Sequence, residues 1–194
     1  MAEKGDSTRA RILDEAMRIA SRDGLEGLSI GTLAGALDLS KSGLFAHFGS
    51  KEALQMAVLE HAATRVGERL APARRLPAGP ERLRFQLEIT MDWIDDPALP
   101  GGCPITGACI EFDDREGRVR ELLLKLQRNS HQRSVELFEA FADPSRDRDQ
   151  LAFEFRAIGL GYHHAARVLR DQRARTWART ALESLIEQAQ RPKR

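Results

Sequence analysis

Residues 37–54 have the sequence LDLSKSGLFAHFGSKEAL, in which the apolar spacing of a helix is combined with small polar residues. Ser and Gly weaken helices, because Ser hydrogen-bonds to nearby backbone in competing conformations and Gly loses the most backbone entropy on folding. Residues 40–43 are nevertheless Ser-Lys-Ser-Gly. A helix selected for stability alone would carry Ala, Leu or Glu there. We therefore expect that contact with another molecule selects these residues.

Two short helices are expected around this stretch. Ser29 is placed to cap a helix over 30–37, and Ser40 is placed to cap a second helix that Gly49 ends. Two short helices separated by a tight turn are typical of a helix-turn-helix.

The second of these helices has two different faces. At about 100° per residue, Leu44 and Phe48 fall together and are expected to pack inward, whereas Ser42 and Ala46 point away. Small outward side chains allow the backbone to approach the DNA major groove. A plain connector between larger helices would show the same pattern. Acidic and basic residues are also nearly balanced over residues 1–55, so the pattern alone leaves both interpretations open.

The composition of the whole chain is that of an ordinary globular protein. It has 194 residues, 42% of them hydrophobic and 30% charged, with a formal net charge of +1. The apolar runs are too short to span a membrane, and residues 1–13 lack the apolar core of a secretion signal. Two Cys without a secretion signal favour reduced thiols. We expect a cytoplasmic protein with no membrane partner.

Helical periodicity continues through the rest of the chain, and strand patterns are missing. After a linker over 71–80, further helices are expected over 80–95, 104–113, 116–142, 147–170 and 172–190. The predicted fold is all-α, with about nine helices. An N-terminal three-helix helix-turn-helix domain is expected over 1–50 and a helical bundle over 51–194, with the helix over 51–70 as connector.

Residues 8–54 resemble the DNA-binding domain of the TetR family of transcriptional regulators. The resemblance rests on the RIL…A…G stretch of the first helix, the small residues around Leu33 and Ala34, and the string Ser-Lys-Ser-Gly-Leu-Phe-x-His-Phe-x-Ser-Lys-Glu-x-Leu. It implies a homodimer with an N-terminal helix-turn-helix and a divergent helical C-terminal domain. In that family the C-terminal domain both dimerises and holds a small effector, and helices 147–170 and 172–190 are the expected dimer pair.

The resemblance also assigns residues to double-stranded operator DNA. Carried over by position, the residues that face DNA are Ser29, Lys41, Ser42, Gly43, Phe45 and His47. Ser40 would cap the recognition helix, and Lys51 would contact a phosphate. The family often has Tyr at the position of Phe45, so this residue would make an apolar contact here, for example with a thymine methyl group.

A small-molecule effector, expected to be apolar, would bind among the C-terminal helices. Small residues over 106–109 could leave space for it, although tight helix packing selects small residues too. The predicted pocket residues are Met91, Trp93, Thr106, Cys109, Ile110, Phe138, Phe155 and Tyr162. No cofactor is expected. No metal is expected either, because the adjacent His163 and His164 point about 100° apart on a helix, which is poor geometry for joint metal ligation.

The predicted function is that of a ligand-responsive transcriptional regulator, a repressor that a small molecule releases from its operator. The alternative is a regulator without a small effector, controlled by oxidation of Cys103 and Cys109 or by a protein partner. An all-α enzyme is disfavoured, since the chain lacks the usual catalytic and nucleotide-binding motifs.

Overall fold

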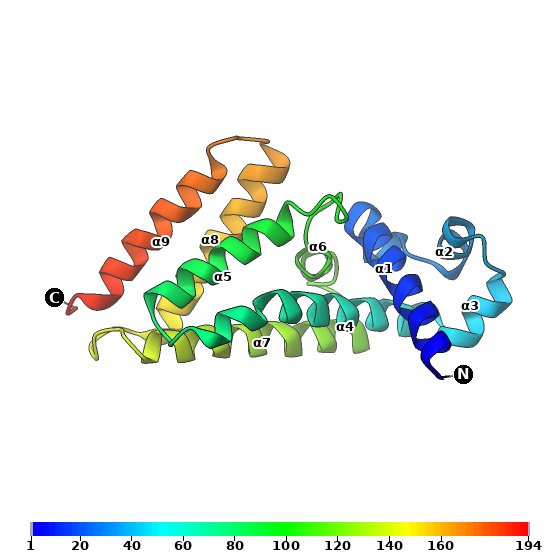
Figure 1. Ribbon diagram of the computed structural model, residues 1–194, viewed down its shortest axis with the longest axis horizontal. Helices are drawn as coiled ribbons and strands as arrows, with labels where there is room; N and C mark the ends of the chain where they lie inside the picture. Colours follow the sequence, from blue (N-terminus) through cyan, green and yellow to red (C-terminus); the bar gives the residue numbers. More distant parts are fainter. Residues whose placement is uncertain (1, 194) are drawn as a thin grey trace. The chain divides into compact units, whose positions relative to one another are not determined.

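The computed structural model describes residues 2–193, with side chains from residue 8 onward. Over these residues the fold is all-α, as predicted, with nine α-helices and no strand (Figure 1). The α-helices are α1 (Ala2–Gly27), α2 (Ile30–Leu37), α3 (Lys41–Phe48), α4 (Lys51–Leu70), α5 (Pro80–Ile94), α6 (Pro104–Glu111), α7 (Arg118–Glu139), α8 (Arg148–His163) and α9 (Ala174–Gln190). A 3₁₀ turn, η1 (Ala71–Arg75), follows α4, and a π turn, η2 (His164–Val168), follows α8. Among the described helices, none is long and apolar enough to cross a membrane.

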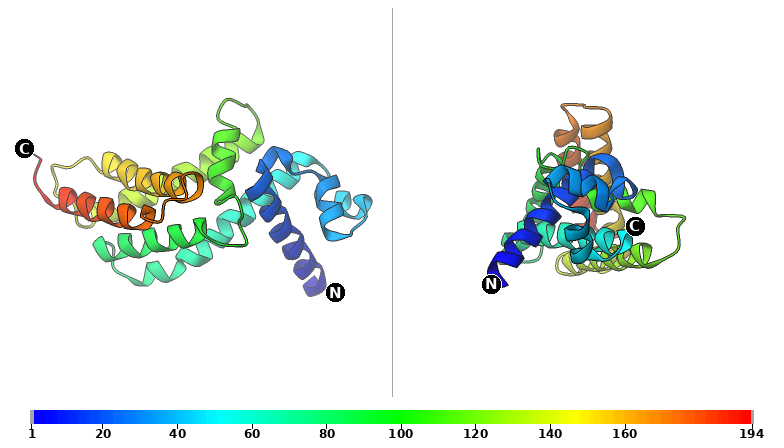
Figure 2. Two further views of the ribbon diagram at one scale, coloured as in Figure 1. Left: turned by 90° about the horizontal axis from the view of Figure 1, so that it is seen from above. Right: turned by 90° about the vertical axis from the view of Figure 1, so that its right-hand side faces the viewer.

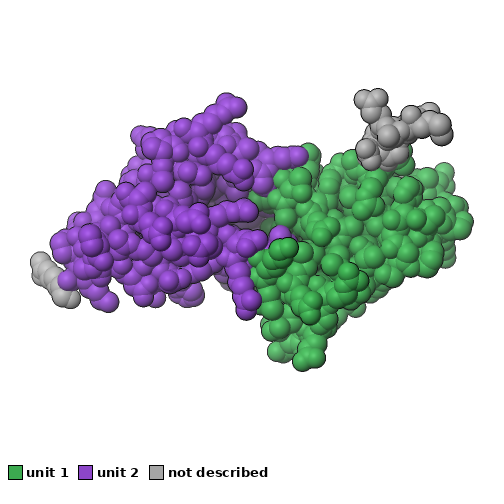
Figure 3. Space-filling model, turned by 90° about the horizontal axis from the view of Figure 1, so that it is seen from below, with its two compact units in different colours: residues 1–66, 96–125 green, residues 67–95, 126–194 purple. Residues whose placement is uncertain are grey.

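The chain forms two compact units (Figure 3). Unit 1 comprises residues 1–66 and 96–125, and unit 2 comprises residues 67–95 and 126–194. This grouping differs from the boundary expected at residue 50. The physical reason is that α6, which comes late in the sequence, packs directly on α1. The division of labour between residues 1–50 and 51–194 stays a prediction.

Unit 1 is built on the apolar stripe of α1. Ile12, Ala16 and Ile19 follow the helical period and are at most 3% exposed. The helix breaks at Gly24, whose φ of 80° lies in the left-handed region that favours glycine. The last turn of α1 therefore takes a new direction before α2 begins.

Unit 2 has one apolar core. Its buried members come from α5, α7, α8 and α9 and from the turns next to them. They are Leu83, Leu87, Met91, Ile94, Leu137, Phe138, Ala142, Leu151, Tyr162, Ala174, Ala178, Leu182, Leu185, Ile186 and Ala189. Helices α8 and α9 lie side by side as an antiparallel pair (Figures 1 and 2). The N–H of Asp143, before α8, donates to the carbonyl of Ala189, at the end of α9, at 2.8 Å.

Candidate nucleic-acid interface

Local capping fixes the two short helices. Ser29 and Thr32 form a capping box at the start of α2, in which the Thr32 N–H donates to Ser29 Oγ at 3.0 Å and the Ser29 N–H donates to Thr32 Oγ1 at 2.9 Å. Asp38 ends α2 in the left-handed conformation, with φ 53°. The helix starts where the sequence predicts it, because side-chain oxygens satisfy its free N–H groups.

Helix α3 has a cap at each end and two anchors. Ser40 Oγ accepts the N–H of Gly43 at 3.1 Å, and Gly49, with φ 73°, ends the helix. Leu44 is 1% exposed and Phe48 9%, so the predicted inward face is confirmed. Burying two such side chains stabilises the helix by roughly 1.5–3 kcal/mol each, more than its weak residues cost.

The cap also explains the glycine in this helix. A Cβ at Gly43 would lie 3.0 Å from Ser40 Oγ, which is tighter than nearly all real Cβ contacts. Any larger residue at Gly43 would press on the oxygen that caps the helix. The cap therefore favours glycine at position 43, and the predicted approach of DNA to this residue stays a prediction.

The outward face of α3 is exposed. Its residues are Lys41, Ser42, Gly43, Phe45, Ala46 and His47. Phe45 is 56% exposed, an unusual position for an aromatic side chain that has no partner surface. The face offers one fixed positive charge, one hydroxyl group, an imidazole and an apolar ring. This combination can contact phosphates, base edges and thymine methyl groups.

Lys51 is engaged inside unit 1. Its Nζ donates to the carbonyl oxygen of Glu26 at 2.8 Å and lies 3.3 Å from Glu26 Oε2. Gln55 Nε2 donates to Glu26 Oε1 at 3.1 Å, and this bond, followed by that of Lys51, lowers the pKa of Glu26. Lys51 thus ties α4 to the end of α1. The predicted phosphate contact stays a prediction.

A docking contact that the sequence did not reveal holds α6 to the break in α1. The carboxylate of Glu111 accepts the N–H groups of Leu25 and Glu26, both at 2.7 Å. These N–H groups are freed by the break at Gly24, so Glu111 caps the new helical direction. The sequence alone does not indicate this contact, because two partners 86 residues apart leave no local pattern.

The loop before α6 docks on the same end of α1. Ser21 Oγ donates to the carbonyl of Gly102 at 2.8 Å, and the N–H of Gly101 donates to Ser21 Oγ at 3.0 Å. A Cβ at Gly101 would lie only 1.6 Å from the carbonyl oxygen of Ser21. Gly101 is therefore the residue that lets the two backbones meet.

The predicted pocket residues fall into both units. Met91, Phe138 and Tyr162 belong to the core of unit 2, and Phe155 packs against that core. Trp93, on another face of α5, is 4% exposed.

The three predicted pocket residues on α6 lie in unit 1. Thr106 and Cys109 are half-buried, but Ile110 is 72% exposed, which is not the burial expected of a pocket wall. Ala108 is fully buried, and Gly107 is exposed with no atom within 4 Å of an added Cβ. Close packing of α6 on α1 accounts for the small residue at 108. Cys103 and Cys109 are free and half-buried.

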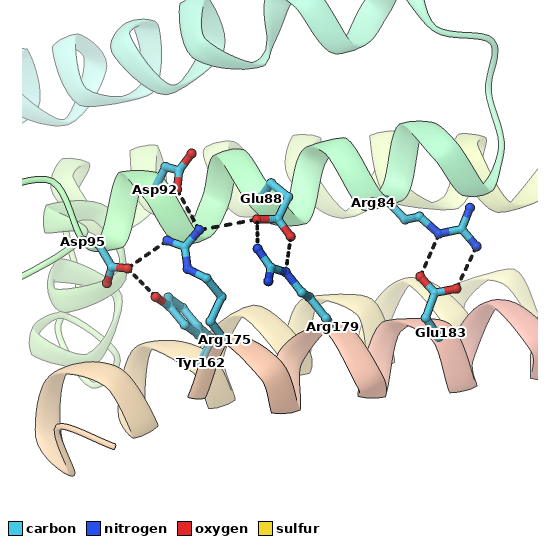
Figure 4. A network of polar contacts seen from close by, with 8 residues as sticks. All are labelled: Arg84, Glu88, Asp92, Asp95, Tyr162, Arg175, Arg179 and Glu183. Carbon is cyan, nitrogen blue, oxygen red and sulfur yellow. Dashed lines mark hydrogen bonds and ion pairs between the residues drawn. The ribbon is translucent and has the colours of Figure 1, made fainter. Parts of the chain in front are cut away.

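Ion pairs connect α5 to α9 along one face of unit 2, and we call them the ion-pair ladder (Figure 4). Arg84 pairs with Glu183 in two parallel bonds of 2.7 Å. Arg179 makes a similar pair with Glu88, at 2.6 and 2.8 Å. The hydrogen bonds from Arg179 are the main cause that lowers the pKa of Glu88.

At one end of this ladder, Arg175 contacts acids on successive turns of α5. It donates to Asp92 and Asp95, both at 2.9 Å. The hydroxyl of Tyr162, from α8, also donates to Asp95. Burial, and then this hydrogen bond, raises the pKa of Tyr162 to about 12. Three helices of unit 2 therefore meet at Asp95.

An apolar stripe on α8 and α9 is left uncovered. The exposed residues on α8 and the following turns repeat at helical spacing; they are Phe153, Ala157, Leu160, Gly161, His164 and Val168. Trp177 and Ala181 continue the exposed surface on α9. Phe153 is 61% exposed, Val168 65% and Trp177 46%. Large apolar side chains that are exposed at helical spacing make this face a candidate interaction surface.

Two family models match the chain. One, described as bacterial regulatory proteins of the tetR family, matches residues 12–58. The other, described as a tetracyclin repressor-like C-terminal domain, matches residues 79–182. No curated protein sequence shows a significant match.

Solved structures are similar over nearly the whole length of the chain. A TetR transcriptional regulator from Chloroflexus aurantiacus J-10-fl is 29% identical, with a TM-score of 0.85, and 96% of this chain and 97% of that chain are covered. A TetR-family regulator from Streptomyces coelicolor is 21% identical, with a TM-score of 0.84 and coverage of 94% and 96%. AibR, in complex with isovaleryl coenzyme A and operator DNA, is 21% identical, with a TM-score of 0.75 and coverage of 92% and 98%. At this identity the last two show the fold alone.

Proposed function

The chain belongs to the TetR family of transcriptional regulators, and on this basis we propose that it is a homodimeric repressor released from its operator by a small molecule. The observation that carries the proposal is the outward face of α3. Both ends of this helix are capped, Leu44 and Phe48 are buried, and its other residues are exposed. Caps and buried residues hold α3 in place, although several of its exposed residues have low helix propensity. This combination fits a recognition helix in the major groove.

Four exposed residues of α3 have a role in this proposal. Lys41 supplies the charge for a phosphate or for a guanine edge, and Ser42 and His47 supply hydrogen bonds to bases. Phe45 contacts a thymine methyl group, because it has no hydroxyl to reach a phosphate. Ser29 and Ser40 contribute through their caps, which fix the starts of α2 and α3 and so orient these helices toward the DNA.

Homodimerisation is supported by the exposed stripe on α8 and α9. A dimer places two recognition helices about one turn of DNA apart, and a monomer offers only one. The middle of the stripe has small residues, Ala157 and Gly161, which allow a second α8–α9 pair to approach closely. The partner we propose is therefore a second copy of this chain at a two-fold interface.

The effector role is proposed for unit 2. AibR, a structural neighbour, has been solved with both a small-molecule ligand and operator DNA. Its fold is shared with this chain, which supports a ligand site among the C-terminal helices here. An effector acts by favouring a dimer whose recognition helices do not fit the operator, so it must bind that state more tightly.

The test is operator binding. Operator sequences are selected from random DNA with the purified protein, and affinities are then measured by fluorescence anisotropy. Lys41→Ala is expected to lose about 1–3 kcal/mol of binding free energy and to change the preferred base at one position in each half-site. Lys125→Ala, which removes an exposed lysine from α7, is the matched control and should bind as the wild type does. Equal affinities for the two variants would refute the placement of α3 in the groove.

A further inference from the structure

Helix α5 has a second row of residues, part polar and part apolar, that is not part of the ion-pair ladder. Its residues recur at i, i+4, i+7 and i+11, which places them in one row along the helix. They are Arg82, Gln86, Ile89 and Trp93, and we call them the Arg82–Trp93 stripe. The ladder on the neighbouring face satisfies its charges with α9 (Figure 4). Arg82, the charged residue of the Arg82–Trp93 stripe, is not part of these ion pairs.

The indole at one end of the stripe has an unused donor. Trp93 is 4% exposed, and its Nε1 is buried without a hydrogen-bond partner. The guanidinium of Arg69 stacks over the ring at 5.0 Å from its centroid, which fixes the orientation of the indole. Native proteins satisfy nearly all of their buried donors, because a donor without an acceptor is destabilising.

The guanidinium at the other end is also unsatisfied. Arg82 is half-buried, and its Nε is buried without a hydrogen-bond partner. In the part of the chain that the structure describes, Arg82 has no ion pair with a carboxylate. Arg84, two residues further along, makes two bonds of 2.7 Å to Glu183. Packing alone would be served better by Leu or Met than by an unpaired arginine.

The two unsatisfied donors are aligned. Eleven residues correspond to about 16 Å along a helix axis and to a rotation of only about 20°. Between them lie the half-buried side chains of Gln86, which can donate and accept, and Ile89, which is apolar. The row therefore runs from a positive charge, past an amide and an aliphatic side chain, to an indole N–H.

We propose that the Arg82–Trp93 stripe binds an amphipathic anion, which is the effector of the regulator. A carboxylate or phosphate group of the ligand pairs with Arg82, its apolar body lies along Ile89, and an acceptor atom meets the Trp93 N–H. A cation would be repelled by Arg82, and a pure hydrocarbon would leave both donors unsatisfied. The inference rests on the proposed effector role of unit 2, and it replaces the expected apolar effector by an acidic one.

The test uses three probes with the same ten-carbon chain: decanoate, decyl phosphate and decyltrimethylammonium. Their affinities for the full-length protein are measured by isothermal titration calorimetry below their micelle concentrations. We expect the wild type to bind at least one of the two anions roughly tenfold or more tightly than the cation, as charge-assisted hydrogen bonds require. The anion that binds more tightly identifies the acidic group.

Arg82→Gln is the decisive variant and Arg84→Gln is its matched control, because both remove one positive charge from α5. Arg82→Gln should lose about tenfold in anion affinity and all preference over the cation, and Arg84→Gln should keep both. Trp93→Phe should weaken anion binding severalfold without changing the charge preference. Thermal unfolding of the ligand-free proteins checks folding, and Arg82→Gln should melt no lower than the wild type, since it removes an unsatisfied buried group.

Three results would overturn the inference: no binding of either anion, equal binding of anion and cation by the wild type, or equal anion affinities of Arg82→Gln and Arg84→Gln. Operator binding, measured on the same samples, separates this failure from that of the proposed function. A protein that binds its operator but not the anions refutes the ligand class only. A protein that binds the anions through Arg82 but no DNA refutes the proposed repressor and leaves the anion site standing.

Discussion

Replacing Gly101 by Ala tests the docking of the α6 loop on α1. An added Cβ would lie 1.6 Å from the carbonyl oxygen of Ser21 and 2.6 Å from its carbonyl carbon. Both are backbone atoms of a helix, which cannot move aside as a flexible side chain can. The loop must therefore retreat, and it loses the bonds that join Ser21 to Gly101 and Gly102.

The size of the effect follows from these two bonds. Each contributes about 1 kcal/mol, so Gly101→Ala should lower the free energy of unfolding by about 2 kcal/mol. For a chain of this length the expected fall in melting temperature is about 4–8 °C. Thermal unfolding followed by circular dichroism, at one fixed protein concentration, measures it.

Gly107→Ala is the matched control, because it adds the same methyl group on α6, where no atom lies within 4 Å. Ala is up to about 1 kcal/mol better than Gly inside a helix, so this variant should melt slightly higher than the wild type. If Gly101→Ala were as stable as Gly107→Ala, the loop would not be docked on α1 in the way described.

Three further predictions concern unit 2. Tyr162 is the only tyrosine in the chain, so its ultraviolet titration should show a single phenolate forming near pH 12, and a midpoint near pH 10 would contradict its burial. Because its pKa is raised on folding, the stability that it contributes is present below pH 10 and is lost as the pH rises toward 12. The pKa of Glu88 is lowered from 4.5, so the stability that it contributes is present above pH 4.5 and is lost as the pH falls below that value. The urea midpoints of unfolding at about pH 5 and pH 3 should therefore differ less for Arg179→Gln than for the wild type, and equal differences would exclude a role of the Arg179–Glu88 pair. If the proposed dimer forms through α8 and α9, Leu160→Glu should be monomeric in light scattering, whereas Leu124→Glu on α7 should stay dimeric, and a dimeric Leu160→Glu would place the interface elsewhere.

The recognition helix could be predicted closely from the sequence because its signals are local. Ser29, Ser40 and Gly49 act on residues three or four positions away, and the period of Leu44 and Phe48 sets the buried face. These features need no knowledge of the rest of the chain.

The contacts between distant segments could not be predicted in the same way. Glu111 reaches Leu25 across 86 residues, and Arg84 reaches Glu183 across 99. Nothing in a single sequence indicates which acid meets which donor. The predicted pocket set was divided for the same reason, since helical periodicity shows that Ile110 and Met91 lie on helices but not which helices surround them.

The discontinuity of unit 1 limits how this protein can be engineered. Its compact fold needs residues 96–125, which the ribosome makes only after the first 29 residues of unit 2. A fragment that stops at residue 66 would lack α6 and would leave the N–H groups of Leu25 and Glu26 without their carboxylate. A chimeric protein that keeps unit 1 intact must therefore carry two separate segments, residues 1–66 and 96–125. Only then does Glu111 still accept the N–H groups of Leu25 and Glu26.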